Sequence, residues 1–421
     1  MFDIKYIREH PEKVKEGCKK KQVHDVDIDK LLEVDKKKRE MQKGLEEIRA
    51  KKNEANKAIN EASSQEEKDR IISEMKEIKE KEAELEKEFK GLEQEFKNLL
   101  KKIPNLPFDE VPVGEDDDEN KVLRKEGEIP EFDFTPDDHL GIGEKLDIID
   151  TKRAAKTSGA RFTFLKREAV LLQFAIINLA FEVTVKKGFY PILPPVMLKP
   201  EMMDAMGFLE RGADDIFHIE KDDLYLAGTS EQVIGAMYAG ETFQENELPK
   251  RYVGYSTCFR REAGSYGKDT RGILRVHQFD KVEMFSFTTP EKSKEEHDFL
   301  LSIEEELMRL LGIPYQVIDI CTGDLGDPAA KKYDIEAWMP GQERYRETHS
   351  TSNCTDFQAR GLNIRYKHEE GTSHLHTLNG TALAMGRILI AILENNQTKE
   401  GIVKIPEALH KYLPFTEIKR S

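Results

Sequence analysis

Two segments of this chain, residues 252–262 and 275–287, carry guanidinium, carboxylate and aromatic side chains at alternate positions. In an extended strand, side chains two positions apart lie on the same face. This spacing puts Arg260 and Glu262 together on the first segment, and it aligns five side chains on the second: Arg275, His277, Phe279, Lys281 and Glu283. If the segments pair as a hairpin, their joint surface suits an anionic nucleotide beside a zwitterionic small molecule, because guanidinium groups bind phosphate and carboxylate through two hydrogen bonds.

Taken one at a time, these charges would also fit an exposed strand pair with cross-strand ion pairs. The order of the whole stretch is more specific, since CFRREAGSYGKDTRG is followed two residues later by RVHQFDKVEMF. It resembles the motif 2 region of class II aminoacyl-tRNA synthetases, in the form found in seryl-tRNA synthetases. The resemblance implies that Arg260 binds the serine carboxylate or the α-phosphate of ATP and that Phe279 stacks on adenine. It also implies that Glu262 contacts the nucleotide, that Glu283 holds serine and that Arg275 helps with the phosphates.

Residues 226–232, LAGTSEQ, follow a short predicted strand and begin a helix. Thr229 and Gln232 have the spacing of a capping box, which would account for them without any ligand. Glu231 is not needed for that cap. Seryl-tRNA synthetases have a T-x-E stretch before motif 2, and the resemblance implies that Thr229 and Glu231 face the ammonium group of serine.

Residues 345–360, YRETHSTSNCTDFQAR, are dense in small polar side chains. A strand and loop with internally satisfied hydroxyl groups would have the same composition. The segment resembles the one that closes over ATP in the family, which implies that Glu347 and Ser350 are oxygen ligands of a Mg²⁺ ion bridging the phosphates. The chain departs from the commoner family pattern at Thr348 and His349, and we expect His349 to be a packed or solvent-facing histidine.

Residues 376–387, HTLNGTALAMGR, run from an extended segment into an apolar helix. Arg387 lies about two turns into that helix and would otherwise form a salt bridge. The segment resembles motif 3 of class II synthetases, which implies that Arg387 reaches the γ-phosphate of ATP and shares the catalytic work with Arg260 and Glu262. Asn379 and Thr381 stand at the junction of strand and helix, where the resemblance implies contacts with serine.

Residues 187–195, KGFYPILPP, come after a predicted helix over residues 166–187. A proline at the edge or end of a strand would need no special role. The segment resembles motif 1, with Pro195 marking it, and the resemblance implies a homodimer formed through this helix and strand.

Residues 28–103 contain no proline, and their apolar side chains recur in alternating steps of three and four. The pattern predicts two helices of about 35 residues, each on the order of 50 Å long, that fold back at residues 63–65 as an antiparallel coiled-coil hairpin. No small core could bury such a hairpin, so we expect it to project as a dimerisation rod or a partner-binding arm.

Charge distinguishes the two halves of this hairpin. Residues 31–60 carry nine Lys or Arg against six Asp or Glu, whereas residues 61–100 carry eight against thirteen. A solvated charged face would explain the basic half on its own. Beside motifs that resemble those of a tRNA enzyme, phosphate contact is favoured, and we expect it from four side chains: Lys36, Lys38, Arg39 and Lys43.

Composition sets the remaining limits. The 421 residues carry a net charge of −15, which argues for a soluble protein and against a generally basic nucleic-acid coat protein. The longest apolar run, residues 169–181, is shorter than the 20 or so residues of a membrane span, so we expect a core helix and no membrane. The four cysteines are widely spaced, which indicates neither a disulfide framework nor a zinc site, and a reducing cytoplasm is the simplest location.

These patterns together predict an α+β protein. We expect an N-terminal tRNA-binding domain over residues 1–110, a linker within residues 104–120 and a catalytic domain over residues 111–421. By resemblance, the catalytic domain has an antiparallel six-stranded sheet and joins L-serine to tRNA with ATP and Mg²⁺. Whether the tRNA for selenocysteine is a second acceptor stays open at this point. A ligase that charges a carrier protein and a non-enzymatic coiled-coil scaffold remain as alternatives.

Overall fold

The computed structural model describes residues 1–62, 64–263 and 272–420, so most of the Gly-rich loop between the two motif 2 segments lies outside the described residues. The chain divides into two compact units. The larger consists of Asn105–Ser421 together with Met1 and Lys20–Gln22, and the smaller consists of Phe2–Lys19 and Val23–Pro104.

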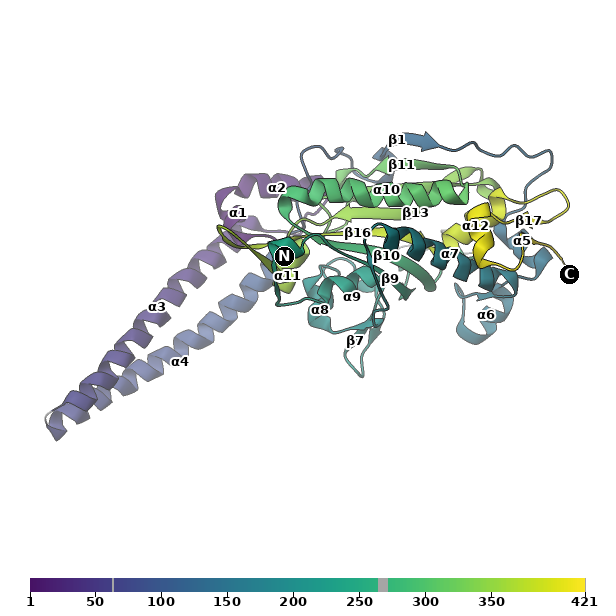
Figure 1. Cartoon of the computed structure of the whole chain (residues 1–421). Coiled ribbons are helices and arrows are strands. Elements are labelled where there is room, and N and C mark those ends of the chain that lie inside the picture. Colours follow the sequence, from purple (N-terminus) through teal and green to yellow (C-terminus); the bar gives the residue numbers. More distant parts are fainter. Residues whose placement is uncertain (63, 264–271, 421) are drawn as a thin grey trace. The chain divides into compact units, whose positions relative to one another are not determined.

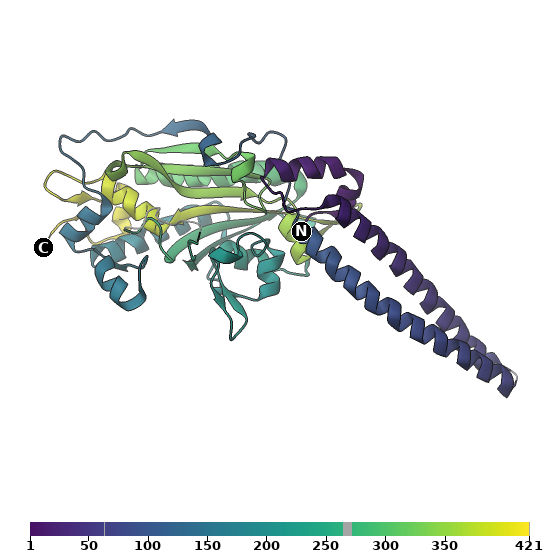
Figure 2. The same cartoon turned by 180° about the vertical axis from the view of Figure 1, so that it is seen from behind.

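The smaller unit is helical, with two short helices, α1 (Ile4–Glu9) and α2 (Pro11–Lys20), before two long ones, α3 (Ile28–Glu61) and α4 (Gln65–Lys101). Figures 1 and 2 show α3 and α4 side by side and antiparallel, which confirms the predicted hairpin. Asp27 caps α3 by accepting a hydrogen bond from the amide of Lys30 at 2.9 Å. Apolar side chains from both helices are buried in this unit: Leu31, Val34, Leu45, Phe96 and Leu100.

The larger unit is built on one eight-stranded sheet, whose strand order is β1-β11-β12-β13-β16-β10-β9-β4. The six central strands are antiparallel, as expected for the class II fold. The structure adds β1 antiparallel to β11 at one edge and β4 parallel to β9 at the other. In that order, the strands span Lys121–Glu126, Tyr315–Asp319, Lys331–Met339, Arg344–Asn353, His376–Ala384, Gln278–Thr288, Lys250–Phe259 and Tyr190–Ile192.

Three helices contribute to the main core against this sheet: α7 (Glu168–Lys186), α10 (Ser293–Leu311) and α12 (Met385–Asn395). A second apolar cluster joins Phe285 and Phe287 of β10 to Ile234 of α9 (Ser230–Ala236). Met284, the residue directly before Phe285, belongs to the main core instead. The alternation along β10 therefore separates two apolar layers on opposite faces of the sheet.

Short elements complete the larger unit. The helices are α5 (His139–Leu146), α6 (Thr151–Ser158), α8 (Pro200–Ala205) and α11 (Phe357–Leu362). The small strands are β2 (Ile149–Asp150), β3 (Phe164–Leu165), β5 (Met197–Leu198), β6 (His218–Ile219), β7 (Leu224–Leu226), β8 (Thr242–Gln244), β14 (Arg365–His368), β15 (Gly371–His374), β17 (Val403–Lys404) and β18 (Glu417–Ile418). Short 3-10 helices lie at Asp117–Glu119, Ala213–Asp215, Glu245–Glu247, Pro290–Lys292, Thr322–Asp324, Pro340–Gln342 and Glu407–Tyr412.

The helix α7 is long and apolar enough, by length and composition, to cross a membrane, and half of its most apolar stretch is buried inside the structure. Leu172 and Ile176 are fully buried on the sheet side, whereas Leu171 and Phe174 are 47% and 53% exposed. Its buried side matches the predicted core helix over residues 169–181, and its outer side leaves an apolar surface.

The segment predicted as a linker is instead packed from its start. Asn105 is buried, and its side-chain amide donates to the carbonyl groups of Pro328 and Cys354 at 2.8 and 2.9 Å. Lys21 is also buried, and its ammonium group donates to the carbonyl groups of Gly326 and Ala329 at 2.7 and 2.9 Å. The prolines and acidic residues of this segment indicated a linker, and a long-range hydrogen-bond network packs its beginning against the larger unit.

Candidate active site

A cavity of about 440 Å³ lies in the larger unit over the strands β10, β13 and β16. Its lining includes the twelve residues of the larger unit to which the resemblance assigned binding or catalysis: Thr229, Glu231, Arg260, Glu262, Arg275, Phe279, Glu283, Glu347, Ser350, Asn379, Thr381 and Arg387. These side chains come from positions 229 to 387, and the fold brings them into one site.

Strand register sets the positions of the acidic and hydroxyl groups. On β10, Glu283 lies opposite Thr381 of β16, because the pairing of these strands shifts between Val282 and Glu283. Ser352 of β13 lies opposite Asn379 of β16. The carboxylate of Glu283 forms an ion pair with the ammonium of Lys281, and both side chains are almost fully buried. The floor of the cavity is thus polar and largely desolvated.

Glu231 is held at this floor by two amide groups. Its Oε1 atom accepts hydrogen bonds from Gln358 Nε2 at 3.0 Å and Asn379 Nδ2 at 2.9 Å. Burial, reinforced by the negative charge of Glu283, raises the pKa of Glu231 to about 7. A carboxylate so placed gains strongly from a cation, which is what an ammonium group would supply.

The helix start beside Glu231 differs from the predicted capping box. Thr229 is the N-cap residue, and its hydroxyl accepts from the amide of Glu231 at 3.3 Å. Gln232 does not close the box, because its Oε1 atom accepts from the amide of Gly228 at 2.9 Å, one residue earlier than the motif requires.

The first motif 2 segment also departs from simple alternation. The strand β9 ends at Phe259, so Arg260 and Glu262 lie beyond it. Glu262 has a left-handed backbone, with φ of 53°, and its carboxylate accepts from Arg275 Nη1 at 2.6 Å. The guanidinium group of Arg260 lies 5.4 Å from the ring centroid of Phe279. A turn and an ion pair therefore bring Glu262 to the cavity.

His277 is a correction to the predicted surface. It precedes β10 and is absent from the lining of the cavity, although Arg275 and Phe279 on either side belong to that lining. Its Nδ1 atom lies 3.0 Å from the carbonyl oxygen of Arg260, and its ring packs 5.4 Å from that of Phe162. His277 therefore contacts the backbone of the turn at Arg260 on the side away from the cavity.

Arg387 is the third residue of α12 and so lies in its first turn, not two turns into the helix as predicted. Glu347 and Arg387 form an ion pair at 3.0 Å, and Arg387 also donates to the carbonyl oxygen of Glu347 at 2.9 Å. Desolvation opposes ionisation of Glu347, but the positive charges of Arg387, Lys332 and Arg260 outweigh it and lower its pKa. Glu347 is therefore anionic at neutral pH and can act as an oxygen ligand for a cation.

His349 is packed and not solvent-facing, which is the first of the two predicted environments. It is 1% exposed, its Nδ1 atom lies 2.8 Å from the hydroxyl of Thr348, and burial lowers its pKa to about 3. A neutral buried imidazole on β13 has a packing role.

Three side chains join the site that sequence reasoning did not select. Lys332 lines the cavity. Asp334 is buried opposite Ser350, with Lys332 Nζ 3.4 Å from its Oδ2 atom. Gln358 holds Glu231 and accepts from the hydroxyl of Thr377 at 2.7 Å. Alternating charges in KKYDIE, residues 331–336, were a usable signal, whereas Gln358 was hidden on a helix within a segment read mainly for its hydroxyl groups.

An antiparallel sheet with its arginines, carboxylates and hydroxyl groups gathered over the central strands defines a class II aminoacyl-tRNA synthetase core, and residues 216–396 match the tRNA synthetase class II core domain (G, H, P, S and T). Residues 1–107 match the seryl-tRNA synthetase N-terminal domain. The chain belongs to the seryl-tRNA synthetase family.

Relatives support this over the full length. A serine–tRNA ligase of Rubrobacter xylanophilus is 46% identical, with 98% of both chains covered. The structure is similar to that of the seryl-tRNA synthetase from Pyrococcus horikoshii complexed with ATP, with 40% identity, complete coverage of both chains and a TM-score of 0.91. It is also similar to the cytoplasmic serine–tRNA ligase from Naegleria fowleri in complex with AMP, with 35% identity, 100% and 99% coverage and a TM-score of 0.88.

Proposed function

We propose that this chain joins L-serine to tRNA through a seryl-adenylate intermediate, using ATP. The observation that carries the proposal is the convergence of twelve separately selected side chains on one cavity in a chain of this family. In the first step, a serine carboxylate oxygen attacks the α-phosphorus of ATP and pyrophosphate leaves. In the second, a hydroxyl group of the terminal ribose of tRNA attacks the activated carbonyl carbon and AMP leaves.

Neither step needs a covalent nucleophile from the protein. The site has to hold two anionic groups in line and offset the charge that develops at phosphorus. Arg260 has the guanidinium group best placed for this, because it lies beside Phe279, the proposed platform for adenine. Arg275 and Arg387, held by Glu262 and Glu347, then serve the other phosphate oxygens.

Serine fits the polar floor of the cavity. Glu231 and Thr229 would accept the ammonium group, which brings a positive charge to the buried carboxylate. Glu283, Thr381 and Asn379 lie together across β10 and β16, where they can hydrogen-bond the serine hydroxyl. A side chain without a hydroxyl group would leave these buried polar atoms unpaired.

Glu347 and Ser350 fit a Mg²⁺ site whose remaining ligands come from the substrate. Among the described residues, no three His, Cys, Asp or Glu side chains gather as a metal site. Mg²⁺ commonly takes one or two protein oxygens and obtains the rest from phosphates and water. Anionic Glu347 and the hydroxyl of Ser350 are such a pair, and the ion would neutralise charge on the phosphates of bound ATP.

The tRNA contacts are proposed for the basic helix α3. Lys36, Arg39 and Lys43 are exposed on it, whereas Lys38 lies 4.3 Å from the ring centroid of Phe96 on α4. Matching residues 1–107 to the N-terminal domain of this family argues against the carrier-protein ligase, which resembles the catalytic core without the arm. The complete site argues against a scaffold without activity.

A cytoplasmic homodimer completes the proposal. The apolar outer side of α7 continues onto the segment of β4, where Tyr190 and Leu193 are 65% and 75% exposed. Together with Leu171 and Phe174, they form an apolar surface of the kind that subunit interfaces cover. Dimerisation through motif 1 would remove it from water.

Two assays test the proposed function. Serine-dependent exchange of pyrophosphate into ATP measures the first step, and charging of bulk tRNA with each amino acid in turn measures both. We expect serine to be the preferred amino acid in both assays. Exchange with serine but no tRNA charging would favour the carrier-protein ligase, and no exchange with any amino acid would refute an activating enzyme.

A further inference from the structure

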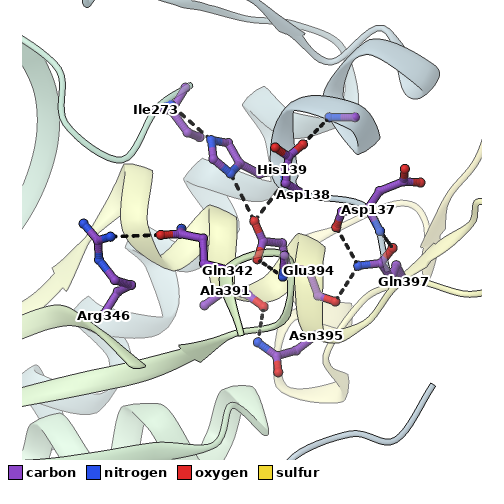
Figure 3. A network of polar contacts seen from close by, with 12 residues as sticks. Asp137, Asp138, His139, Ile273, Gln342, Arg346, Ala391, Glu394, Asn395 and Gln397 are labelled. Carbon is purple, nitrogen blue, oxygen red and sulfur yellow. Dashed lines mark hydrogen bonds and ion pairs between the residues drawn. The ribbon is translucent and has the colours of Figure 1, made fainter. Parts of the chain in front are cut away.

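A buried network away from the proposed substrate contacts links three segments of the larger unit (Figure 3). Its centre is Glu394, near the end of α12, which has no exposed surface. One carboxylate oxygen accepts from the backbone amide of His139 at 2.9 Å and contacts the Nδ1 atom of the same residue at 3.0 Å. The other accepts from the amide of Gly341 at 2.9 Å. The first residue of α5 is thereby tied to the motif 3 helix.

The far side of the imidazole determines its tautomer. His139 Nε2 lies 3.4 Å from the backbone nitrogen of Ile273, which can only donate. Nε2 must therefore accept, and Nδ1 carries the hydrogen that is donated to Glu394. In this form, the neutral ring bridges a carboxylate of α12 to the backbone of the second motif 2 segment, as Figure 3 shows.

Glycines make this approach possible on both sides of Ile273. Gly272 has φ of +82°, and a Cβ atom there would lie 2.0 Å from His139 Nε2. Gly386, the residue before Arg387, would place a Cβ atom 2.8 Å from the carbonyl oxygen of Ile273. The Ile273 peptide is thus held between the imidazole and the start of the motif 3 helix.

The held segment leads directly into the cavity. Ile273, Leu274 and Arg275 all line it, and Arg275 pairs there with Glu262. We propose that His139 is a positioning residue for the nucleotide, because its neutral imidazole ties the Ile273 backbone to the motif 3 helix and so sets where Arg275 enters the cavity. The inference rests on the proposed function, since the nucleotide is the ATP of that reaction.

The contact to Ile273 can be separated from the anchoring of α5. Just before α5, the amide of Asp137 donates to Gln397 Oε1 at 2.8 Å, and Gln397 Nε2 donates to the carbonyl oxygen of Asp137 at 3.0 Å. The backbone amide of His139 also keeps its bond to Glu394 in any variant. Replacing the imidazole therefore leaves α5 attached to α12.

Two amide variants of His139 separate the contact with Glu394 from the contact with Ile273. In His139→Asn, the amide stands near the former Nδ1 and keeps only the contact with Glu394. In His139→Gln, the longer amide reaches the former Nε2 and offers an acceptor to Ile273. We expect His139→Asn to raise the KM for ATP in serine-dependent exchange about tenfold, the loss of roughly one hydrogen bond. The KM for serine and the Tm should stay near the wild-type values, and His139→Gln should recover most of the ATP affinity.

A matched control is His218→Asn, which removes another histidine that contacts a carboxylate, Asp223 at 3.1 Å, outside the cavity lining. It should leave both KM values unchanged. Equal KM values for ATP in the two His139 variants, or a parallel rise in both KM values with a fall in Tm, would overturn the positioning role. If His139→Asn does not fold, Gly272→Ala crowds the same contact and should raise the KM for ATP selectively. An unchanged KM there would also overturn it.

A binding measurement distinguishes failure of the positioning role of His139 from failure of the proposed function. Binding of a non-hydrolysable ATP analogue to the wild type and both His139 variants, measured by calorimetry, requires no amino acid and no turnover. Weaker binding in His139→Asn alone would support the positioning role even if serine failed to support exchange. Normal exchange with serine and identical analogue affinities in all three proteins would refute His139 while leaving the function intact.

Discussion

The cavity and the helical hairpin carry charge in opposite ways. In the cavity, Glu231, Lys281 and Glu283 are each less than a tenth exposed and have defined partners. On the hairpin, the side chains of Arg39 and Lys43 are 55% and 79% exposed; Arg39 pairs with the buried carboxylate of Asp35, and Lys43 pairs with Glu47 at the surface. A buried charge that is lost cannot be replaced by another side chain or by water, so its removal has a large effect. Exposed charges each contribute a small and roughly additive amount to the binding free energy. Single substitutions should therefore affect the cavity far more than the hairpin.

Removing the hairpin should have the largest effect, and it tests whether the cavity and the hairpin have separate functions. Replacing residues 28–102 by a short flexible linker should nearly abolish tRNA charging, because the proposed phosphate contacts are lost together. Serine-dependent pyrophosphate exchange should persist, since all residues that line the cavity lie in the larger unit. Full charging by the shortened protein would leave the hairpin a structural rod.

The preference for serine over alanine tests whether the buried polar floor of the cavity recognises the serine hydroxyl group. Serine should be preferred over alanine by up to about 10⁴-fold in kcat/KM for exchange, because alanine leaves Glu283 and Thr381 without a hydroxyl partner. Thr381→Val should reduce this ratio with little effect on alanine. Comparable kcat/KM values for the two amino acids in the wild type would show that the hydroxyl is not read here.

Arg260→Ala tests a single cavity charge. Loss of one charge-assisted contact at the transition state should lower kcat for exchange roughly a hundredfold, or about 3 kcal/mol. The Tm should change little, because the guanidinium group is part-buried, packs on Phe279 and donates to the carbonyl oxygen of Gly228. Arg346→Ala, which removes an arginine outside that cavity lining, is the control. Near-normal exchange by Arg260→Ala would refute the assignment.

The protonation of Glu231 predicts a pH dependence. Because the free-enzyme pKa is raised to about 7, the carboxylate form that binds ammonium is lost as the pH falls below 7. The KM for serine should then rise about tenfold per pH unit, while the ammonium of serine stays charged. Glu231→Gln should bind serine weakly with a flat profile. A wild-type KM that is constant from about pH 5.5 to 8 would contradict this role.

The smallest effect is expected on the hairpin surface. Lys36→Gln should raise the KM for tRNA only a few-fold and reduce the slope of log KM against log salt concentration by about one unit. Lys81→Gln, at an exposed position on the acidic helix α4, is the matched control and should change neither quantity. Replacing Lys36, Lys38, Arg39 and Lys43 together should add the individual slopes. Equal effects of the two single substitutions would remove the distinction between the helices.

How much could be predicted from the sequence depended on whether the determining contacts are local. The hairpin was readable because heptad spacing repeats within each helix, and α3 ends at Glu61 before α4 begins at Gln65. The cavity residues were found because each motif is a short stretch of the chain that resembles its counterpart in class II synthetases. The register that pairs Glu283 with Thr381 could not be read, since it depends on a shift between two strands about a hundred positions apart.

The sequence by itself determined the helical arm, because heptad periodicity is local to each helix, whereas the antiparallel core and the members of the motifs followed from the resemblance of those motifs to the class II synthetases. Only the tertiary structure decided that Glu262 reaches the cavity through a left-handed turn while His277 lies behind it. It also decided that Gln358 holds Glu231 and that His139 bridges Glu394 to Ile273. The physical reason is that burial and hydrogen bonding between distant segments exist only once the sheet has assembled.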